Sequence, residues 1–330
     1  MSSTASTPSY AESVSSPVAE RHVRSFLDTL NNSGGPPMET LTPVAARAVL
    51  TGAQNSVKVN LRPADVSRKT IDVAGESINL TIVRPQGATG TLPVFMFFHG
   101  GGWVLGDYPT HERFIRDLVA ESGAVAVYVD YTPSPEAQYP TAINQAYAAT
   151  QWVADHGGDI QVDGKRLAVV GNSVGGNMAA VVALRAALEN GPDIRFQVLF
   201  WPVTDARFDT GSYDQFESNH FLTRGMMKWF WDNYTKDPAR RNEIYASPLR
   251  ATHDQLKGLP PALVQTSELD VLRDEGEAYA RKLDEAGVEV IALRINGMIH
   301  DYGLLNPLAD VPAVQAALRQ AAAEIKRRLS

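Results

Sequence analysis

Residues 171–175 read Gly-Asn-Ser-Val-Gly and place a serine in the pattern G-x-S-x-G. Small residues on both sides of a serine let a strand turn sharply into a helix, which exposes the hydroxyl as a nucleophile. The apolar run 167–170 precedes this segment, and apolar residues at helical spacing follow it from Val174. We therefore predict that Ser173 is a nucleophile raised above a sheet. The alternative is a glycine-rich turn with an incidental serine.

A second glycine-rich segment, His99 followed by three glycines, closes the apolar run 94–98. Consecutive glycines free the backbone to aim its N–H groups into a site, and loops of this type form the oxyanion hole of lipases and esterases. We predict that the N–H groups of Gly101, Gly102 and Val174 are the oxyanion donors. The alternative is a flexible or phosphate-binding loop, although no G-K-[ST] follows as in a P-loop. His99 is expected to be structural.

A serine nucleophile needs a base, which an acid must orient. His300 lies beyond the last predicted strand, residues 288–295, where the third member of a Ser–Asp–His order belongs. We predict that His300 is the base. The remaining histidines are expected at the surface or in packing positions: His22, His111, His156, His220 and His253.

Two carboxylates follow the predicted strand 262–266 and compete as the acid. We favour Asp270, because the run 270–276 leads directly into a helix. Glu268 remains the rival. Asp274 and Glu275 are expected to favour the positive N-terminus of that helix.

The periodicity of apolar residues predicts the elements that position these groups. From about residue 93, short apolar runs alternate with amphipathic helices, which predicts an α/β fold with a mostly parallel sheet flanked by helices. Ligands of such sheets bind beyond the carboxyl ends of the strands. Upstream, residues 66–82 alternate with a period of two, as in a hairpin.

We expect five segments along the chain. Residues 1–16 are predicted to be a disordered lead-in, and residues 17–60 to form N-terminal cap helices. Residues 61–206 and 252–330 are predicted to form the catalytic domain. Residues 207–251, rich in aromatic side chains, are read as a helical cap insertion above the sheet.

Composition excludes several other functions. The 330-residue chain has a net charge of −7, which makes nucleic acid a poor partner. It contains no cysteine, so disulfides, thiolate chemistry and cysteine-ligated metals are excluded. Its apolar runs are too short to span a bilayer, and its N-terminus does not read as a secretory signal. We therefore expect a cytoplasmic protein that needs no membrane and no metal.

The motif segments resemble the hormone-sensitive-lipase family of bacterial carboxylesterases (family IV). The similar segments are 99–102, 130–136, 171–176, 270–276 and 297–300, collinear over about residues 60 to 325. The resemblance implies an α/β-hydrolase fold with a helical cap and hydrolysis of short-to-medium acyl esters. It implies no metal or organic cofactor. Members of the family often dimerise, so the resemblance also allows a homodimer.

The chain departs from the family pattern next to its predicted catalytic residues. The family usually has Asp and Ala around the serine, where this chain has Asn172 and Val174. We expect the β-branched Val174 to narrow the acyl pocket. Asp301 and Tyr302 follow the base in place of a glycine-rich turn. We expect Asp301 at the pocket mouth, where it would disfavour anionic substrates, and the alternative is a solvated loop charge.

Aromatic residues are the remaining candidates for the substrate pocket. Trp103 follows the oxyanion loop and Trp201 ends the predicted strand 196–200, so both are expected to wall the pocket. The insertion adds further candidates: Phe208, Phe216, Phe221 and Trp229. Each is equally explained by core packing.

Acyl transfer on a small-molecule ester is the chemistry that these residues predict. One rival is a non-catalytic small-molecule receptor on the same fold, although such proteins tend to lose the base and His300 is present. The other is amidase or acyltransferase chemistry with the same three residues, because function depends on the site rather than on the fold.

Overall fold

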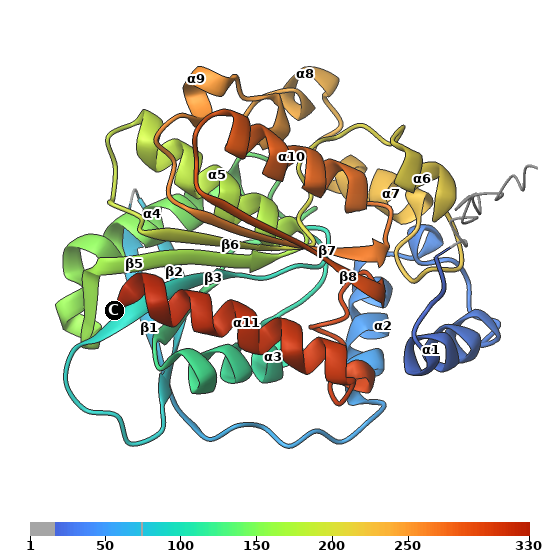
Figure 1. Ribbon diagram of the computed structural model, residues 1–330, viewed down its shortest axis with the longest axis horizontal. Helices are drawn as coiled ribbons and strands as arrows, with labels where there is room; N and C mark the ends of the chain where they lie inside the picture. The colour runs from blue at the N-terminus through green and yellow to red at the C-terminus, as the bar shows by residue number, and fades with distance from the viewer. Residues whose placement is uncertain (1–16, 74) are drawn as a thin grey trace, which may run out of the picture.

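The computed structural model describes residues 17–73 and 75–330, so the predicted lead-in of residues 1–16 lies outside the described residues. An eight-stranded sheet runs through the centre of the molecule in the order β1-β2-β4-β3-β5-β6-β7-β8 (Figure 1). The strands are β1 (Ala64–Val73), β2 (Glu76–Pro85), β3 (Leu92–Phe98), β4 (Val125–Asp130), β5 (Val162–Asn172), β6 (Phe196–Phe200), β7 (Ala262–Leu269) and β8 (Val290–Ile299).

The strand sequences explain which part of the sheet is parallel. Strands β3 to β8 pair in parallel, and the central ones are largely buried and rich in apolar residues because helices cover both of their faces. Strands β1 and β2 pair antiparallel, and β1 is mostly exposed, with alternation of exposed and less exposed side chains over residues 69–73. The predicted mostly parallel sheet with an upstream hairpin is therefore confirmed, and both hairpin strands are longer than their periodicity indicated.

Helices cover the sheet on both sides. They are α1 (Arg21–Asn31), α2 (Pro43–Asn55), α3 (Tyr108–Ser122), α4 (Thr141–His156), α5 (Val174–Leu188), α6 (Gly211–Gln215), α7 (Arg224–Tyr234), α8 (Pro238–Arg241), α9 (His253–Leu256), α10 (Arg273–Glu285) and α11 (Pro312–Leu329). Figure 1 shows α3 and α11 on one face of the sheet and α4, α5 and α10 on the other. Within the described residues, no helix has both the length and the apolarity to cross a bilayer.

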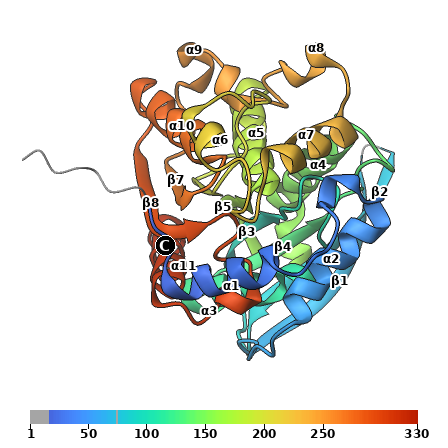
Figure 2. The ribbon, with the colours of Figure 1, turned by 90° about the vertical axis from the view of Figure 1, so that its right-hand side faces the viewer.

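Two segments that are distant in sequence lie together beyond the carboxyl ends of the strands (Figure 2). One holds α1 and α2, and the other, in the predicted insertion, holds α6 and α7. The rings of Phe26 and Phe221 contact each other across this junction at a centroid separation of 6.1 Å. Nearby, Asn31 Nδ2 donates to the carbonyl of Asn219 at 3.1 Å. These two segments therefore stand over the edge of the sheet where ligands of α/β proteins bind.

Polar side chains of α2 fasten the N-terminal segment to loops that hold predicted site residues. Buried Gln54 donates through Nε2 to the carbonyls of Thr110 and Leu304, and its Oε1 accepts from the amide of Asn306 at 2.8 Å. Arg47 donates to the carbonyl of Val104, just after the predicted oxyanion loop, at 2.7 Å. The N-terminal segment thus helps to fix two loops that surround the predicted site.

We predict that Gln54→Leu lowers the free energy of unfolding by about 1–3 kcal/mol, because it leaves buried backbone groups without partners. Urea denaturation followed by tryptophan fluorescence measures this change. The matched control is Gln315→Leu, since Gln315 is exposed on α11. Equal stability of the two variants would contradict the prediction.

Candidate active site

Ser173 occupies a strained turn between β5 and α5. Its backbone lies at φ 56° and ψ −121°, a region that is sparsely populated by residues other than glycine and costs about 1–3 kcal/mol. Its amide donates to the carbonyl of Phe200 at 2.9 Å, and its own carbonyl accepts from the amide of Val203 at 3.2 Å. The neighbouring strand β6 and the loop that follows it therefore hold the turn in place.

The glycines of the motif are required by close backbone approaches. A Cβ atom on Gly171 would lie 2.1 Å from the carbonyl oxygen of Gly175. A Cβ atom on Gly175 would lie 1.9 Å from the carbonyl oxygen of Phe98, at the end of β3. The serine turn thus packs directly against the strand that leads into the second glycine-rich loop.

Three predicted residues meet at this turn although they are far apart in sequence. His300 Nε2 lies 2.9 Å from Ser173 Oγ, and His300 Nδ1 lies 2.7 Å from Asp270 Oδ2. Each of the three residues is at most 4% exposed. The other carboxylate oxygen, Asp270 Oδ1, accepts from the amide of Leu272 at 3.0 Å. This arrangement can pass a proton from the hydroxyl to the imidazole while the carboxylate holds the ring.

The charge around His300 sets its protonation. Burial disfavours the imidazolium, but the carboxylates of Asp270 and Asp301 together outweigh burial, and the pKa of His300 is raised above its ordinary value of 6.5. The imidazole must be neutral to accept the serine proton. The ability of His300 to act as a base is therefore lost as the pH falls through this raised pKa.

The rival acid and the other histidines lie elsewhere. Strand β7 extends to Leu269, and Glu268 within it accepts the amide of Gly297 at 2.7 Å rather than facing the imidazole. His111 is buried against the carbonyl of Asp107. Three of the other four histidines are exposed, namely His22, His156 and His253, and His220 is half-buried.

His99 fixes the first peptide of the second glycine-rich loop. Its Nδ1 lies 2.8 Å from the carbonyl oxygen of Gly100, and its ring stacks on Tyr131 at a centroid distance of 4.1 Å. Burial lowers the pKa of His99 to about 4, so the ring is neutral and Nδ1 donates to that carbonyl. Because a trans peptide points its carbonyl and its N–H in opposite directions, the N–H of Gly101 is turned away from His99.

The predicted oxyanion donors are three backbone amides. Gly101 lies at φ 106° and Gly102 at φ 64°, conformations that favour glycine. The third, Val174, begins helix α5 and carries one of the helix's unpaired N–H groups. Among residues 17–73 and 75–330, none of these three amides donates to an acceptor in the protein. They are therefore available to bind a negatively charged oxygen.

A cavity of about 1110 Å³ opens over this centre. It is lined by Ser173, His300, Gly101 and Gly102, and by apolar side chains of the two segments beyond the sheet. The N-terminal segment contributes Phe26, Leu30, Met38 and Leu41, and the insertion contributes Phe221, Leu222, Met226 and Phe230. The cavity is apolar enough to accept an ester with hydrocarbon groups.

Only two of the predicted pocket residues, Phe221 and Asp301, line this cavity. Trp103 is instead fully buried, with its ring stacked on Tyr234 at 3.8 Å. Trp201 packs edge-on against Tyr302, with ring centroids 4.4 Å apart. The expectation that these two tryptophans wall the pocket is therefore wrong, since core packing takes both rings.

The insertion aromatics also differ from expectation. Phe208 packs edge-on against Tyr213, and Phe216 lies under the guanidinium of Arg273. Trp229 does not line the cavity, whereas the next residue, Phe230, does. Consecutive helical residues point about 100° apart, so only one of this pair can face inward. The spacing of Met226 and Phe230 on α7 was the signal that would have identified the lining face.

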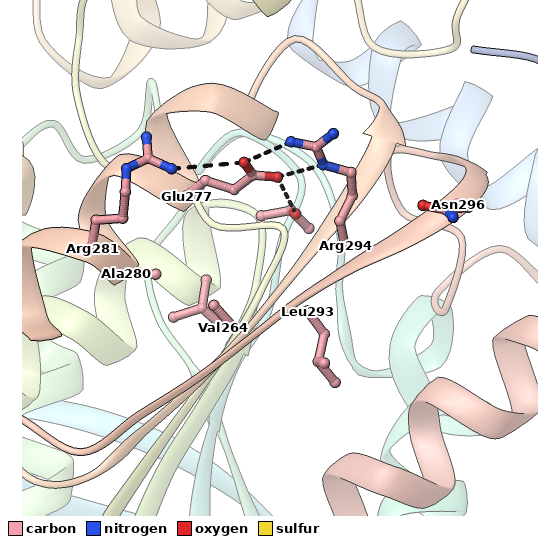
Figure 3. A pocket seen from close by; sticks show the side chains of 9 residues that line it. Val264, Glu277, Ala280, Arg281, Leu293, Arg294 and Asn296 are labelled. Atoms are coloured by element: carbon pink, nitrogen blue, oxygen red, sulfur yellow. Dashed lines mark hydrogen bonds and ion pairs between the residues drawn. The ribbon is translucent and has the colours of Figure 1, made fainter. Parts of the chain in front are cut away.

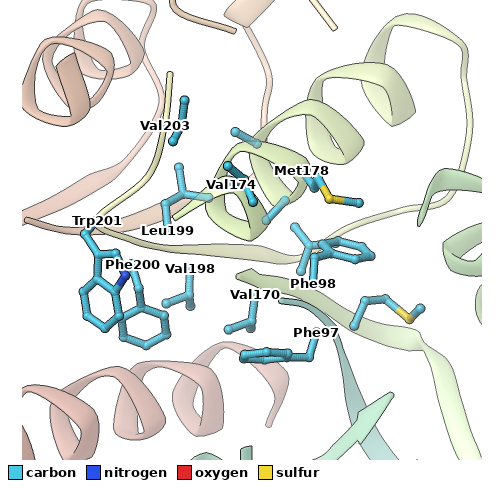
Figure 4. Close-up of a cluster of buried hydrophobic side chains, with 14 of the residues drawn as sticks. Phe97, Phe98, Val170, Val174, Met178, Val198, Leu199, Phe200, Trp201 and Val203 are labelled. Atoms are coloured by element: carbon cyan, nitrogen blue, oxygen red, sulfur yellow. The ribbon is translucent and has the colours of Figure 1, made fainter. Parts of the chain in front are cut away.

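Val174 and Asp301, two of the residues that depart from the family pattern, are both buried. Val174 packs between α5 and β6 near Met178, Leu199 and Val203 (Figure 4). Its side chain does not line the cavity, so the expected narrowing of the acyl pocket by Val174 is wrong. Asp301 is only 6% exposed, which excludes the alternative of a solvated loop charge.

A second hollow of about 460 Å³ lies on the outer side of β8 and α10 (Figure 3). Glu277 pairs there with Arg294 at 2.7 Å and accepts from the hydroxyl of Thr266. The carboxylate is thus already bound by its neighbours. In the described part of the chain, no group of three His, Asp or Glu side chains is arranged to hold a metal ion.

Comparison with known proteins agrees with this geometry. A family model described as the alpha/beta hydrolase fold matches residues 95–304. The carboxylesterase NlhH of Mycobacterium tuberculosis is 34% identical over 266 residues, which cover 80% of this chain and 83% of that protein. The ethyl acetate hydrolase of Pseudomonas putida is 34% identical over 244 residues, covering 72% and 75% respectively.

A solved structure is more similar still. The crystal structure of a thermostable esterase from Pseudomonas putida ECU1011 superposes with a TM-score of 0.95 and is 70% identical. The superposition covers 96% of this chain and 99% of that one. The similarity therefore extends beyond the sheet to the segments that line the cavity.

We predict that Gly102→Ala lowers kcat by about 100-fold to 1000-fold, the usual effect of losing one oxyanion donor. A Cβ atom at this position would lie 2.0 Å from the ring of Phe230, so the loop must move. The matched control is Gly87→Ala, which has a similar positive φ of 69° and open space around it. Steady-state kinetics on p-nitrophenyl acetate measures both, and an equal effect of the two substitutions would contradict the prediction.

Proposed function

We propose that this protein acts through a Ser-His-Asp triad. The chain belongs to the hormone-sensitive-lipase-like family of α/β hydrolases and is a carboxylic ester hydrolase. Ser173 is the nucleophile, His300 the base and Asp270 the acid. The observation that carries the proposal is the pair of buried contacts, 2.9 Å from Ser173 Oγ to His300 Nε2 and 2.7 Å from His300 Nδ1 to Asp270 Oδ2.

In the first half of the proposed cycle, Ser173 Oγ attacks the ester carbonyl carbon while its proton moves to His300 Nε2. The carbonyl oxygen becomes an oxyanion, which accepts from the amides of Gly101, Gly102 and Val174. Asp270 stabilises the imidazolium. The intermediate then collapses, the carbon–oxygen bond to the alcohol breaks, and Nε2 returns the proton to the departing alkoxide. An acyl-enzyme on Ser173 remains.

In the second half, His300 removes a proton from water as the water attacks the acyl carbon. The second tetrahedral intermediate uses the same oxyanion donors. When it collapses, Ser173 recovers its proton from the imidazolium and the carboxylic acid leaves. The cycle consumes only ester and water, and each step uses a group already present in the site.

The proposed substrates are esters with short-to-medium acyl groups. The apolar cavity of about 1110 Å³ supports this range, since it offers more room than a two-carbon acyl group needs. Similarity to an ethyl acetate hydrolase supports the short end of the range. We also propose that residues 17–60 and 207–251 act together as a cap, because side chains from both segments line the cavity.

We predict that Ser173→Ala abolishes both the burst and the steady-state release of p-nitrophenol from p-nitrophenyl acetate. The reason is that no acyl-enzyme can form without Oγ. Ser67→Ala is the matched control, because Ser67 is exposed on β1. Stopped-flow absorbance measures the burst, and a burst that survives in Ser173→Ala would refute the triad.

We predict that kcat/KM for a neutral ester rises with pH through a midpoint above 6.5, because the pKa of His300 is raised and only its neutral form accepts a proton. A pH profile from 5 to 9 at constant ionic strength measures the midpoint. A midpoint well below 6.5, for an enzyme that remains folded across the range, would show that another group controls the rate.

A further inference from the structure

Two residues that depart from the usual family pattern, Asn172 and Asp301, are hydrogen-bonded to each other. Asn172 Nδ2 donates to Asp301 Oδ1 at 3.1 Å, although the residues lie 129 positions apart. The other end of the same carboxamide, Asn172 Oδ1, accepts from the amide of Gly100 at 3.0 Å. One side chain beside the nucleophile therefore joins the glycine-rich loop to the residue after the base.

The carboxylate of Asp301 is held firmly against the imidazole. Its Oδ1 also accepts from Trp201 Nε1 at 2.8 Å, while its Oδ2 lies 3.9 Å from His300 Nε2. The backbone of Asp301 is left-handed at φ 59°, and its carbonyl accepts from the amides of the first turn that follows. Asp301 thus faces the ring nitrogen that receives the serine proton, whereas Asp270 binds the opposite nitrogen.

Among residues 17–73 and 75–330, neither Asp270 nor Asp301 forms a salt bridge with a lysine or arginine, and each is paired only with His300. Asp270 approaches from the end of β7 and Asp301 from its own loop, while Ser173 of α5 and Trp201 after β6 are uncharged. Two further carboxylates line the cavity: Glu39 from the N-terminal segment and Glu217, which is paired with Arg224, from the insertion.

We propose that Asp301, fixed by Asn172 and Trp201, is a positioning residue that favours the imidazolium of His300 from its Nε2 side. The inference rests on the proposed function, because it requires His300 to take up a proton during the reaction. At 3.9 Å the carboxylate forms no hydrogen bond to Nε2, so that nitrogen stays free to bind Ser173 Oγ. Its effect is electrostatic, and burial strengthens it by excluding water.

Asn172 stabilises the buried carboxylate of Asp301 by donating a hydrogen bond to it. An aspartate at position 172 would still accept from Gly100, but it would set one carboxylate against another where the carboxamide now donates. Two like charges at this distance repel each other, so the second carboxylate would weaken the site while adding negative charge near His300. An amide at 172 together with an acid at 301 therefore works as a matched pair.

The first test is Asp301→Asn, which is close in shape and removes only the charge. The midpoint of kcat/KM against pH on p-nitrophenyl acetate, a neutral ester, should fall by about one pH unit or more. Asp310→Asn is the matched control, since Asp310 is exposed nine positions further on. An unchanged midpoint in Asp301→Asn, with thermal unfolding equal to that of the native enzyme, overturns the proposal.

The second test exchanges the amide at position 172 and the acid at position 301. Asn172→Asp should raise the midpoint and lower kcat, and the double variant Asn172→Asp/Asp301→Asn should bring the midpoint back towards that of the native enzyme. Coupling requires the midpoint of the double variant to differ from the sum of the two single-variant shifts, and a midpoint equal to that sum contradicts it.

A second role for Asp301, repulsion of anionic substrates, is tested separately. The substrate is a carboxylate-bearing ester with the same acyl group, assayed at a pH above every midpoint. If Asp301→Asn raises kcat/KM on that ester alone and does not shift the midpoint, Asp301 acts in substrate selection and the positioning role is overturned. Ser173→Ala tests the triad separately from the role of Asp301. If Ser173→Ala is inactive while Asp301→Asn leaves the midpoint unchanged, the triad stands and only the proposed role of Asp301 fails.

Discussion

The strained backbone of Ser173 is the constraint on which the rest of the site depends. The turn at φ 56° exists only because β5 can approach β3 and β6 closely, and side chains at Gly171 or Gly175 would collide with neighbouring backbone. Those contacts determine where the hydroxyl lies. They also bring the start of α5 and the glycine-rich loop after β3 to the same place, so the proposed nucleophile and the proposed oxyanion donors are positioned by one set of packing contacts.

Polar side chains then connect loops that follow different strands. His99 fixes the peptide before Gly101, and Asn172 binds both Gly100 and Asp301. Because each of these groups is buried and bound, the site keeps its geometry without help from a ligand. The cavity above is built differently, from apolar side chains of segments that contribute no catalytic group. The shape of the cavity and the chemistry of the site below it are therefore determined by separate parts of the chain.

The central elements of the fold could be predicted because their patterns are local. Apolar runs and helical spacing located the strands around Ser173, and a parallel sheet necessarily brings their carboxyl ends together. The choice between Asp270 and Glu268 was less secure from sequence, because nothing local showed that β7 continues to Leu269 and turns Glu268 towards Gly297. The position of Glu268 depends on the pairing of β7 with β8, which sequence alone does not reveal.

The residues that line the cavity could not be predicted, because they are set by contacts between segments far apart in sequence. Trp103 and Trp201 lie next to catalytic segments in sequence, yet stacking with Tyr234 and Tyr302 takes both rings into the core. Phe26 and Leu30 reach the cavity only because the N-terminal segment docks on distant loops. The link between Asn172 and Asp301 likewise joins positions 129 residues apart, which no periodicity reveals.

The contacts of Gln54 have a consequence for how the enzyme is made. This residue binds the amide of Asn306, 252 positions further along the chain, so the loop after the base is completed by a segment synthesised near the beginning. Helix α2 can contact Val104 and Thr110 earlier, but its contacts with Leu304 and Asn306 require the last strand to have been made. A fragment without α2 therefore lacks part of the framework that surrounds the loop after His300.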